Sequence, residues 1–195
     1  YVVNVNTPFP WSQIGYIGIR GDNGNLFYVS YFAVSPSPYG GVEAFVNSVE
    51  STGWNVLPYW QNGELVANSS STPAQYIGWR YIPLSNVINI TIHVPSFPKP
   101  NGYPGILIFS KNYGNLPSNM QSGVQSLLIA FYLPGNYQEI YWYSPSGQIV
   151  GLGNTNAYPL PNPNYPFTFT AILTENTAGN VTVYAVYING TQYVV

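Results

Sequence analysis

The clearest pattern in the sequence is an alternation of apolar and polar residues over Val87–Val94. Successive side chains of a strand point to opposite faces. One face therefore receives Ile88, Ile90, Ile92 and Val94, and the other receives Asn89, Thr91 and His93. This alternation predicts a strand in a sheet with one face in the core and one in water. Elsewhere, no segment keeps a helical period over three turns, whereas β-branched and aromatic runs recur throughout.

Turn residues separate these runs. Asn-Gly supplies the two positive-φ positions of a type I′ turn, so it predicts a hairpin at Asn23-Gly24, Asn62-Gly63 and Asn189-Gly190. The last of these would join residues 181–188 to 191–195. A fourth turn, at residues 145–147, is expected to join Tyr137–Tyr143 to residues 148–152. Proline-rich passages at residues 35–39, 95–104 and 159–166 cannot form central strands and are expected as loops or edge covers.

Many short strands without intervening helices predict an all-β protein, specifically a β-sandwich with Greek-key or jelly-roll-like connections. A closed barrel is the alternative. The sequence shows no repeat of 20 to 50 residues, which disfavours solenoids and propellers. We expect one sandwich domain over residues 11–195, preceded at residues 1–10 by a strand and a linker.

Charged residues make up 5% of the 195 residues, against about 25% in an ordinary globular protein. No apolar run approaches the roughly 18 to 20 residues of a spanning helix, so we expect no membrane span. The four basic residues are scattered along the sequence and predict no basic patch, hence neither nucleic acid nor an anionic membrane as a partner. They are Arg20, Arg80, Lys99 and Lys111.

So few titratable groups predict a stability that changes little with pH, which suits an acidic exterior. The sequence starts at Tyr1 without a methionine, as expected of a mature secreted chain after removal of a signal peptide. We therefore expect an extracellular location.

The sequence offers little for catalysis. It has no cysteine and a single histidine, His93, which excludes thiolate chemistry and multi-histidine metal sites. His93 falls on the polar face of its predicted strand, where a solvent-facing histidine is the expected role. We expect no metal, no cofactor and no catalytic residue.

Six carboxylates are available for acid and base chemistry: Asp22, Glu43, Glu50, Glu64, Glu139 and Glu175. Glu139 lies in an aromatic run and would form a glycosidase pair with Glu175 if the carboxyls were roughly 5 to 9 Å apart. This run resembles the nucleophile strand of family 12 glucanases, although Glu139 and Trp142 are three apart where that family has four. An acid-stable glycoside hydrolase is therefore the alternative function, and a monomeric carbohydrate-binding module is a third. The Gln–Glu pair of a glutamic peptidase is not formed by Gln138 and Glu139, because adjacent strand residues face opposite ways.

Four N-x-[S/T] sequons predict N-glycans, at Asn68, Asn89, Asn180 and Asn189. We expect Asn89 on a polar strand face, Asn189 in a turn and Asn68 in a serine-rich loop. Glycans at these positions would solubilise an uncharged surface.

The N-terminus alternates before Pro8-Phe9-Pro10, which is expected to end the strand. A short strand of this kind can pair within its own sheet or complete the sheet of another copy. In the second case the pairing joins subunits head to tail and builds a filament. The predicted donor strand consists of Tyr1, Val2, Val3, Asn4, Val5 and Asn6.

The combination of a charge-poor sandwich rich in Tyr, Asn and Pro, with sequons and such a first strand, resembles the thread filament subunits of thermoacidophilic archaea. The resemblance covers the character of the whole chain. It implies donor-strand linkage between copies, N-glycosylation and a role in adhesion or biofilm formation, with surface or cell–cell contacts. Archaeal bundling pilins assemble in the same way and remain an alternative.

Overall fold

The computed structural model describes residues 4–21, 26–35, 49–50, 59–61, 64–68, 75–99, 105–111, 125–132, 137–155, 166–188 and 191–193. The described residues are almost entirely in strands, and every strand pairing among them is antiparallel. The helical structure in these ranges is of the 3₁₀ type, in the short turn η1 (Trp11–Gln13) and at Lys111. The predicted all-β class is confirmed.

The strands form three sheets. The six-stranded sheet has the order β1 (Val5–Pro10), β16 (Asn180–Ile188), β15 (Phe167–Glu175), β9 (Val87–Val94) and β4 (Tyr31–Ser35), and β17 (Thr191–Tyr193) also pairs with β16. The seven-stranded sheet has the order β14 (Ile149–Thr155), β13 (Tyr137–Tyr143), β12 (Ser126–Tyr132), β11 (Gly105–Ser110), β2 (Ile14–Gly21), β8 (Gln75–Arg80) and β5 (Val49–Glu50). The four-stranded sheet has the order β10 (Ser96–Lys99), β3 (Leu26–Val29), β7 (Glu64–Asn68) and β6 (Tyr59–Gln61).

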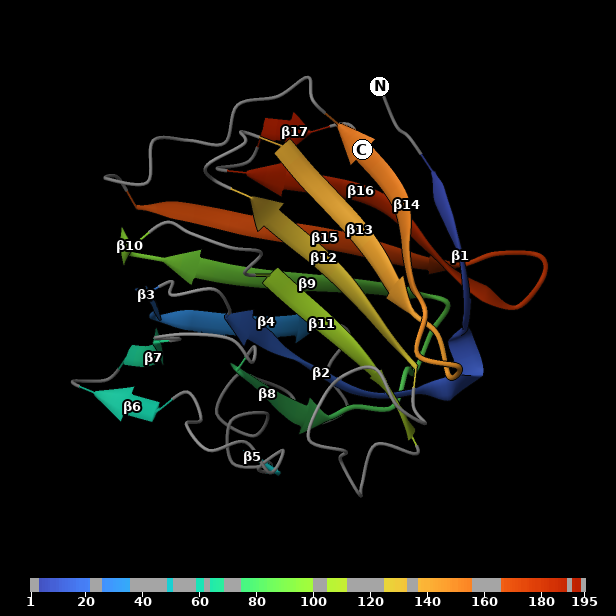
Figure 1. Cartoon of the computed structure of the whole chain (residues 1–195), viewed down its shortest axis with the longest axis horizontal. Coiled ribbons are helices and arrows are strands. Elements are labelled where there is room, and N and C mark those ends of the chain that lie inside the picture. Colours follow the sequence, from blue (N-terminus) through green and yellow to red (C-terminus); the bar gives the residue numbers. More distant parts are fainter. Residues whose placement is uncertain are drawn as a thin grey trace.

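The two large sheets pack face to face as a sandwich, and their strands cross obliquely in Figure 1. Apolar side chains from both sheets form one buried cluster between them. The six-stranded sheet contributes Ile90, Phe169 and Val183, and the seven-stranded sheet contributes Ile17, Ile108 and Ile140. The rings of Phe32 on β4 and Trp79 on β8 bridge the two layers, with centroids 4.9 Å apart.

The prediction of one core face and one wet face is confirmed for β9. Its four predicted core residues are fully buried, and Asn89, Thr91 and His93 are exposed or half-buried. Cross-strand hydrogen bonds connect this polar face to β15: Thr91 Oγ1 lies 2.9 Å from Thr170 Oγ1, and His93 Nδ1 lies 3.0 Å from Thr168 Oγ1.

The seven-stranded sheet differs, because its centre is apolar on both faces. Every residue of β11 is buried. Alternate positions of the sheet face away from the sandwich core and form a second buried cluster, which contains Leu107, Phe109, Leu128, Ala130 and Tyr143. A strand buried on both faces has no alternation of apolar and polar residues. Its sequence therefore cannot predict which side chains enter the sandwich core and which enter the second cluster.

The hairpin predictions have mixed outcomes. Gln61 pairs with Glu64 and Ile188 with Thr191, which confirms that the strands on either side of residues 62–63 and of residues 189–190 pair as predicted; the turn residues themselves lie outside the described ranges. The turn between β13 and β14 is also confirmed: Gly147 has a φ of 84°, and Ser144 N–H donates to the Gln148 carbonyl. The hairpin at residues 23–24 is wrong, because β2 and β3 belong to different sheets.

Proline did not end the first strand where we predicted it would. Strand β1 continues through Pro8 and Pro10, with a register shift between Asn6 and Pro10. Strand β10 lies within the proline-rich passage at residues 95–104, and it is an edge strand, as expected of a passage that cannot form a central strand. Both strands lie at the edge of their sheets. Proline has no backbone N–H to donate, and an edge strand tolerates this because one of its sides faces no neighbouring strand.

Candidate functional site

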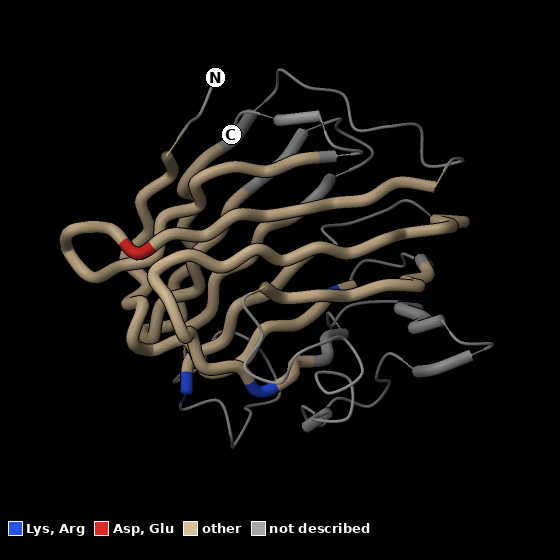
Figure 2. The backbone as a smooth tube through the Cα atoms, turned by 180° about the vertical axis from the view of Figure 1, so that it is seen from behind, with Lys and Arg blue, Asp and Glu red and all other residues tan. Residues whose placement is uncertain are grey.

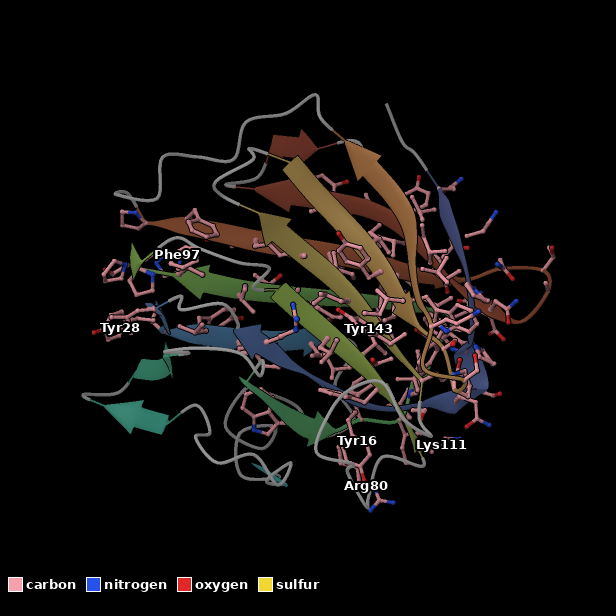
Figure 3. All side chains as sticks on the ribbon, in the orientation of Figure 1. Tyr16, Tyr28, Arg80, Phe97, Lys111 and Tyr143 are labelled. Carbon is pink, nitrogen blue, oxygen red and sulfur yellow. The ribbon has the colours of Figure 1, made fainter. Side chains whose placement is uncertain are left out.

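A small pocket opens beside the ends of β2, β8 and β11, with a volume of about 100 Å³. We call it the cationic pocket. It is lined by Gly15, Tyr16, Arg80, Ile82 and Lys111. A single water needs about 10–15 Å³ of such space, so the pocket has room for a group of several atoms. In Figure 3, Tyr16, Arg80 and Lys111 lie at the same end of the molecule, away from Tyr28 and Phe97.

Strand pairing assembles the pocket. Tyr16 on β2 is in register with Arg80 on β8. On the other side of β2, the ladder with β11 shifts register at Ser110, next to Lys111. Residues distant in the sequence therefore meet because β2 runs between β8 and β11.

Gly15 allows this close approach. A Cβ atom at position 15 would lie 2.5 Å from the Cα of Lys111 and 2.8 Å from its backbone nitrogen. The Gly15 carbonyl also accepts a 3.0 Å hydrogen bond from the N–H of Tyr81. Any larger residue at position 15 would push the Lys111 backbone away from β2.

The pocket is positively charged in a chain that is nearly free of charge. Two of the four basic residues line it, although the chain carries a net charge of −2. No carboxylate is among the described residues that form its wall. Figure 2 shows how sparse charged residues are along the described backbone. A third basic residue, Arg20, is buried in the seven-stranded sheet and does not contribute to this surface.

The segment that follows Arg80 carries exposed apolar side chains. We call residues 81–86, between β8 and β9, the apolar loop. Ile82, which also lines the cationic pocket, is 55% exposed, and Leu84 is 63% exposed. The loop is held firmly, because Tyr81 is buried at its start and the Ser85 hydroxyl donates a 2.8 Å hydrogen bond to the Val87 carbonyl at its end.

The sequence prediction missed this site. We predicted that the basic residues form no patch, and for Arg80 and Lys111 that prediction is wrong, because they share one pocket. No short sequence motif predicts this pocket, because its residues come together only through the pairing of β2 with β8 and β11.

The described part of the predicted donor strand pairs with its own chain. Val5 is in register with Val183 and Asn6 with Thr182 on β16, and Val5 is buried. Asn6 Oδ1 accepts a 2.7 Å hydrogen bond from Thr182 Oγ1. Asn4 is exposed ahead of β1, while residues 1–3 lie outside the described ranges. The strand therefore completes the edge of its own six-stranded sheet.

The predicted glycosylation sites fall in different settings. Asn89 is exposed on the outer face of β9, whereas Asn180 is half-buried at the start of β16. Asn68 is the last residue of β7 rather than part of a loop, and Asn189 lies outside the described ranges. Glycosylation at these four residues stays a prediction.

The predicted carboxylate pair is divided between the two large sheets. Glu139 belongs to β13, where it is in register with Ala130 and Asn154. Glu175 is exposed at the end of β15, where its N–H donates to the Asn86 carbonyl. His93 contacts Thr168 across the six-stranded sheet, with its Nδ1 3.0 Å from Thr168 Oγ1.

The described residues thus form an antiparallel β-sandwich with a cationic pocket beside an exposed apolar loop. No family model matches the sequence, and no solved structure matches it. The chain is 58% identical over 202 residues to a protein named "Putative transmembrane protein ORF1334" from Acidianus two-tailed virus. That alignment covers the whole of this chain and 14% of the viral protein, so the chain spans a small part of its relative's length.

This relative corrects our prediction of partners. We expected other copies of the chain as partners, in a homopolymer, and no membrane span. The expectation about the membrane is wrong in view of the relative, whose name describes a transmembrane protein. In the described ranges themselves, no helix has the length and apolar character needed to cross a bilayer. The homopolymer has no support from the relative, and β1 pairs within its own chain.

Proposed function

We propose that this chain is a non-catalytic β-sandwich module displayed on the outer side of a longer, membrane-associated protein, where it serves structure and adhesion. The observation that carries this proposal is the match of the entire chain to 14% of a viral protein named as a putative transmembrane protein. A segment that folds into its own two-layered core is suited to such a modular role.

The surface chemistry supports an outward-facing position. With six carboxylates, four basic residues and one histidine, the module gains or loses few protons when the external pH changes. A carboxylate-rich surface would instead lose its negative charge in acid. Asn89 offers an exposed acceptor for a glycan on the outer face of the six-stranded sheet.

Linkage through the first strand is not part of this proposal. Val5 and Thr7 are buried in the chain's own sheet, and breaking that pairing would expose the edge of β16. A hydrolase is disfavoured by the division of Glu139 and Glu175 between the two sheets.

Antibody labelling of intact cells or virus particles that carry the protein tests the proposal. Antibodies raised against the purified chain are applied before and after permeabilisation, with gold detection by electron microscopy. We expect labelling of intact surfaces without permeabilisation. Labelling that appears only after the membrane is opened would contradict an outer position.

A further inference from the structure

We propose that the cationic pocket and the apolar loop together dock this module on the surface of an anionic phospholipid bilayer. Arg80 and Lys111 would bind a lipid phosphate, and Ile82 and Leu84 would enter the boundary between headgroups and acyl chains. This inference adds a direct membrane contact to the proposed function and names the chemistry of the partner.

Arg80 and Lys111 bring two positive charges to the wall of one pocket. Two cations that share a pocket form a site for an oxyanion, since the guanidinium group offers paired donors and the ammonium group a compact charge. This pairing stands out because the chain has four basic residues, of which Arg20 is buried in the seven-stranded sheet. A negatively charged bilayer surface attracts each basic residue that lies close to it.

The apolar loop exposes large hydrophobic side chains beside this pocket. Leu84 and Ile82 are the two most exposed large hydrophobic residues among those that the structure describes. Ile82 also lines the pocket, so an apolar group lies directly beside the two cations. Side chains of this kind next to basic groups are the pattern of proteins that lie in the membrane interface.

The rest of the site suits the same partner. Tyr16 contributes an aromatic ring to the pocket wall, and tyrosines are enriched at the level of lipid headgroups. Because buried Tyr81 and the Ser85 hydrogen bond fix the loop, its apolar side chains are presented without a large ordering cost. A free phosphate ion would use the two cations and leave Ile82 and Leu84 without a role.

Co-sedimentation of the purified chain with lipid vesicles tests the proposal. We expect binding to vesicles that contain phosphatidylglycerol, and much weaker binding to vesicles of phosphatidylcholine alone. The double variant R80Q/K111Q should reduce the affinity for anionic vesicles by about 30-fold. The double variant I82S/L84S should reduce it by about tenfold, since each buried methylene contributes to insertion.

Two single variants serve as matched controls. Ile149→Ser removes an apolar side chain that is 49% exposed on β14, and Lys99→Gln removes a charge on β10. Both should bind vesicles like the unmodified chain. All variants should keep the same circular dichroism spectrum and unfolding temperature, since the substituted residues of the site are exposed.

Three results would overturn the proposal. The first is equal binding to neutral and anionic vesicles, and the second is unchanged binding in both double variants. The third is binding of inorganic phosphate that R80Q/K111Q abolishes, together with vesicle binding that I82S/L84S leaves intact; that result would identify an oxyanion site without a membrane contact. Because the assay needs only the purified chain, a negative outcome leaves the surface-labelling test of the proposed function untouched.

Discussion

Thr7 donates a 2.7 Å hydrogen bond from its hydroxyl to the carbonyl oxygen of Val181, 174 residues further along the chain. The same hydroxyl oxygen accepts the N–H of Phe9 at 3.2 Å. Beyond the strand, the N–H of Trp11 donates to the Gly179 carbonyl. Together these bonds attach β1 to the edge of β16.

Thr7→Val should therefore destabilise the protein by about 1–2 kcal/mol, because the shape is kept while the Phe9 N–H and the Val181 carbonyl lose a partner in a buried site. Urea unfolding measures the change. Thr7→Ser keeps the hydroxyl and is the control, with a smaller loss. A Thr7→Val protein as stable as the unmodified chain would contradict the attachment of β1 to its own sheet.

The contact between the two large sheets gives a second prediction. Phe32 is buried against Trp79, whereas its neighbour Tyr31 is 48% exposed on the opposite face of β4. Phe32→Ala should lower the free energy of unfolding by about 3–5 kcal/mol. Tyr31→Ala should lower it by less than about 1 kcal/mol. Equal losses in the two variants, measured by urea unfolding, would argue against the sandwich packing.

Gly15 should tolerate no side chain. Gly15→Ala places a Cβ against the Lys111 backbone and should cost about 1–3 kcal/mol. Gly151→Ala is the matched control, because the nearest atom to a Cβ there is Tyr141 Cε1 at 3.8 Å, an ordinary contact. Thermal unfolding compares the two variants. A Gly15→Ala protein as stable as Gly151→Ala would show that β2 and Lys111 are not in close contact.

Tyr81 predicts a loss of stability in alkali. Burial raises the pKa of Tyr81 to about 12, from about 10 in an unfolded chain. Since the folded state disfavours the phenolate, this contribution is fully present below about pH 10 and is lost as the pH rises to about 12. The loss amounts to about 2–3 kcal/mol. Urea unfolding across this range should show a steeper decline for the unmodified chain than for Tyr81→Phe, and parallel declines would contradict the assignment.

Local patterns predicted the strands and turns that depend on local chemistry. Val87–Val94 was predicted correctly because it has one core face and one wet face. The pairing around residues 62–63 was also predicted correctly, because the Asn-Gly signal lies between two strands that pair directly. Residues 23–24 have the same Asn-Gly signal, yet they separate two sheets, and no local feature distinguishes a hairpin from a crossing between layers.

The candidate site could not be predicted, because it depends on long-range pairing. Arg80 and Lys111 meet only because β2 lies between β8 and β11, and because Gly15 admits the Lys111 backbone. The exposure of Ile82 and Leu84 also depends on tertiary packing, since nearby Tyr81, which carries a polar hydroxyl, is the residue that is buried, at 1% exposure. The sequence of a loop does not show which of its apolar residues are buried in the core and which are exposed on the surface.

The absence of cysteine from the sequence allows a direct measurement of the membrane contact, because one introduced cysteine takes one label. We would attach an environment-sensitive fluorophore at Leu84→Cys and, in a separate control protein, at Ile149→Cys. On addition of phosphatidylglycerol vesicles, the label at position 84 should move into an apolar environment and brighten, while the label at position 149 should not change. Brightening at position 149 with no change at position 84 would contradict docking through the apolar loop.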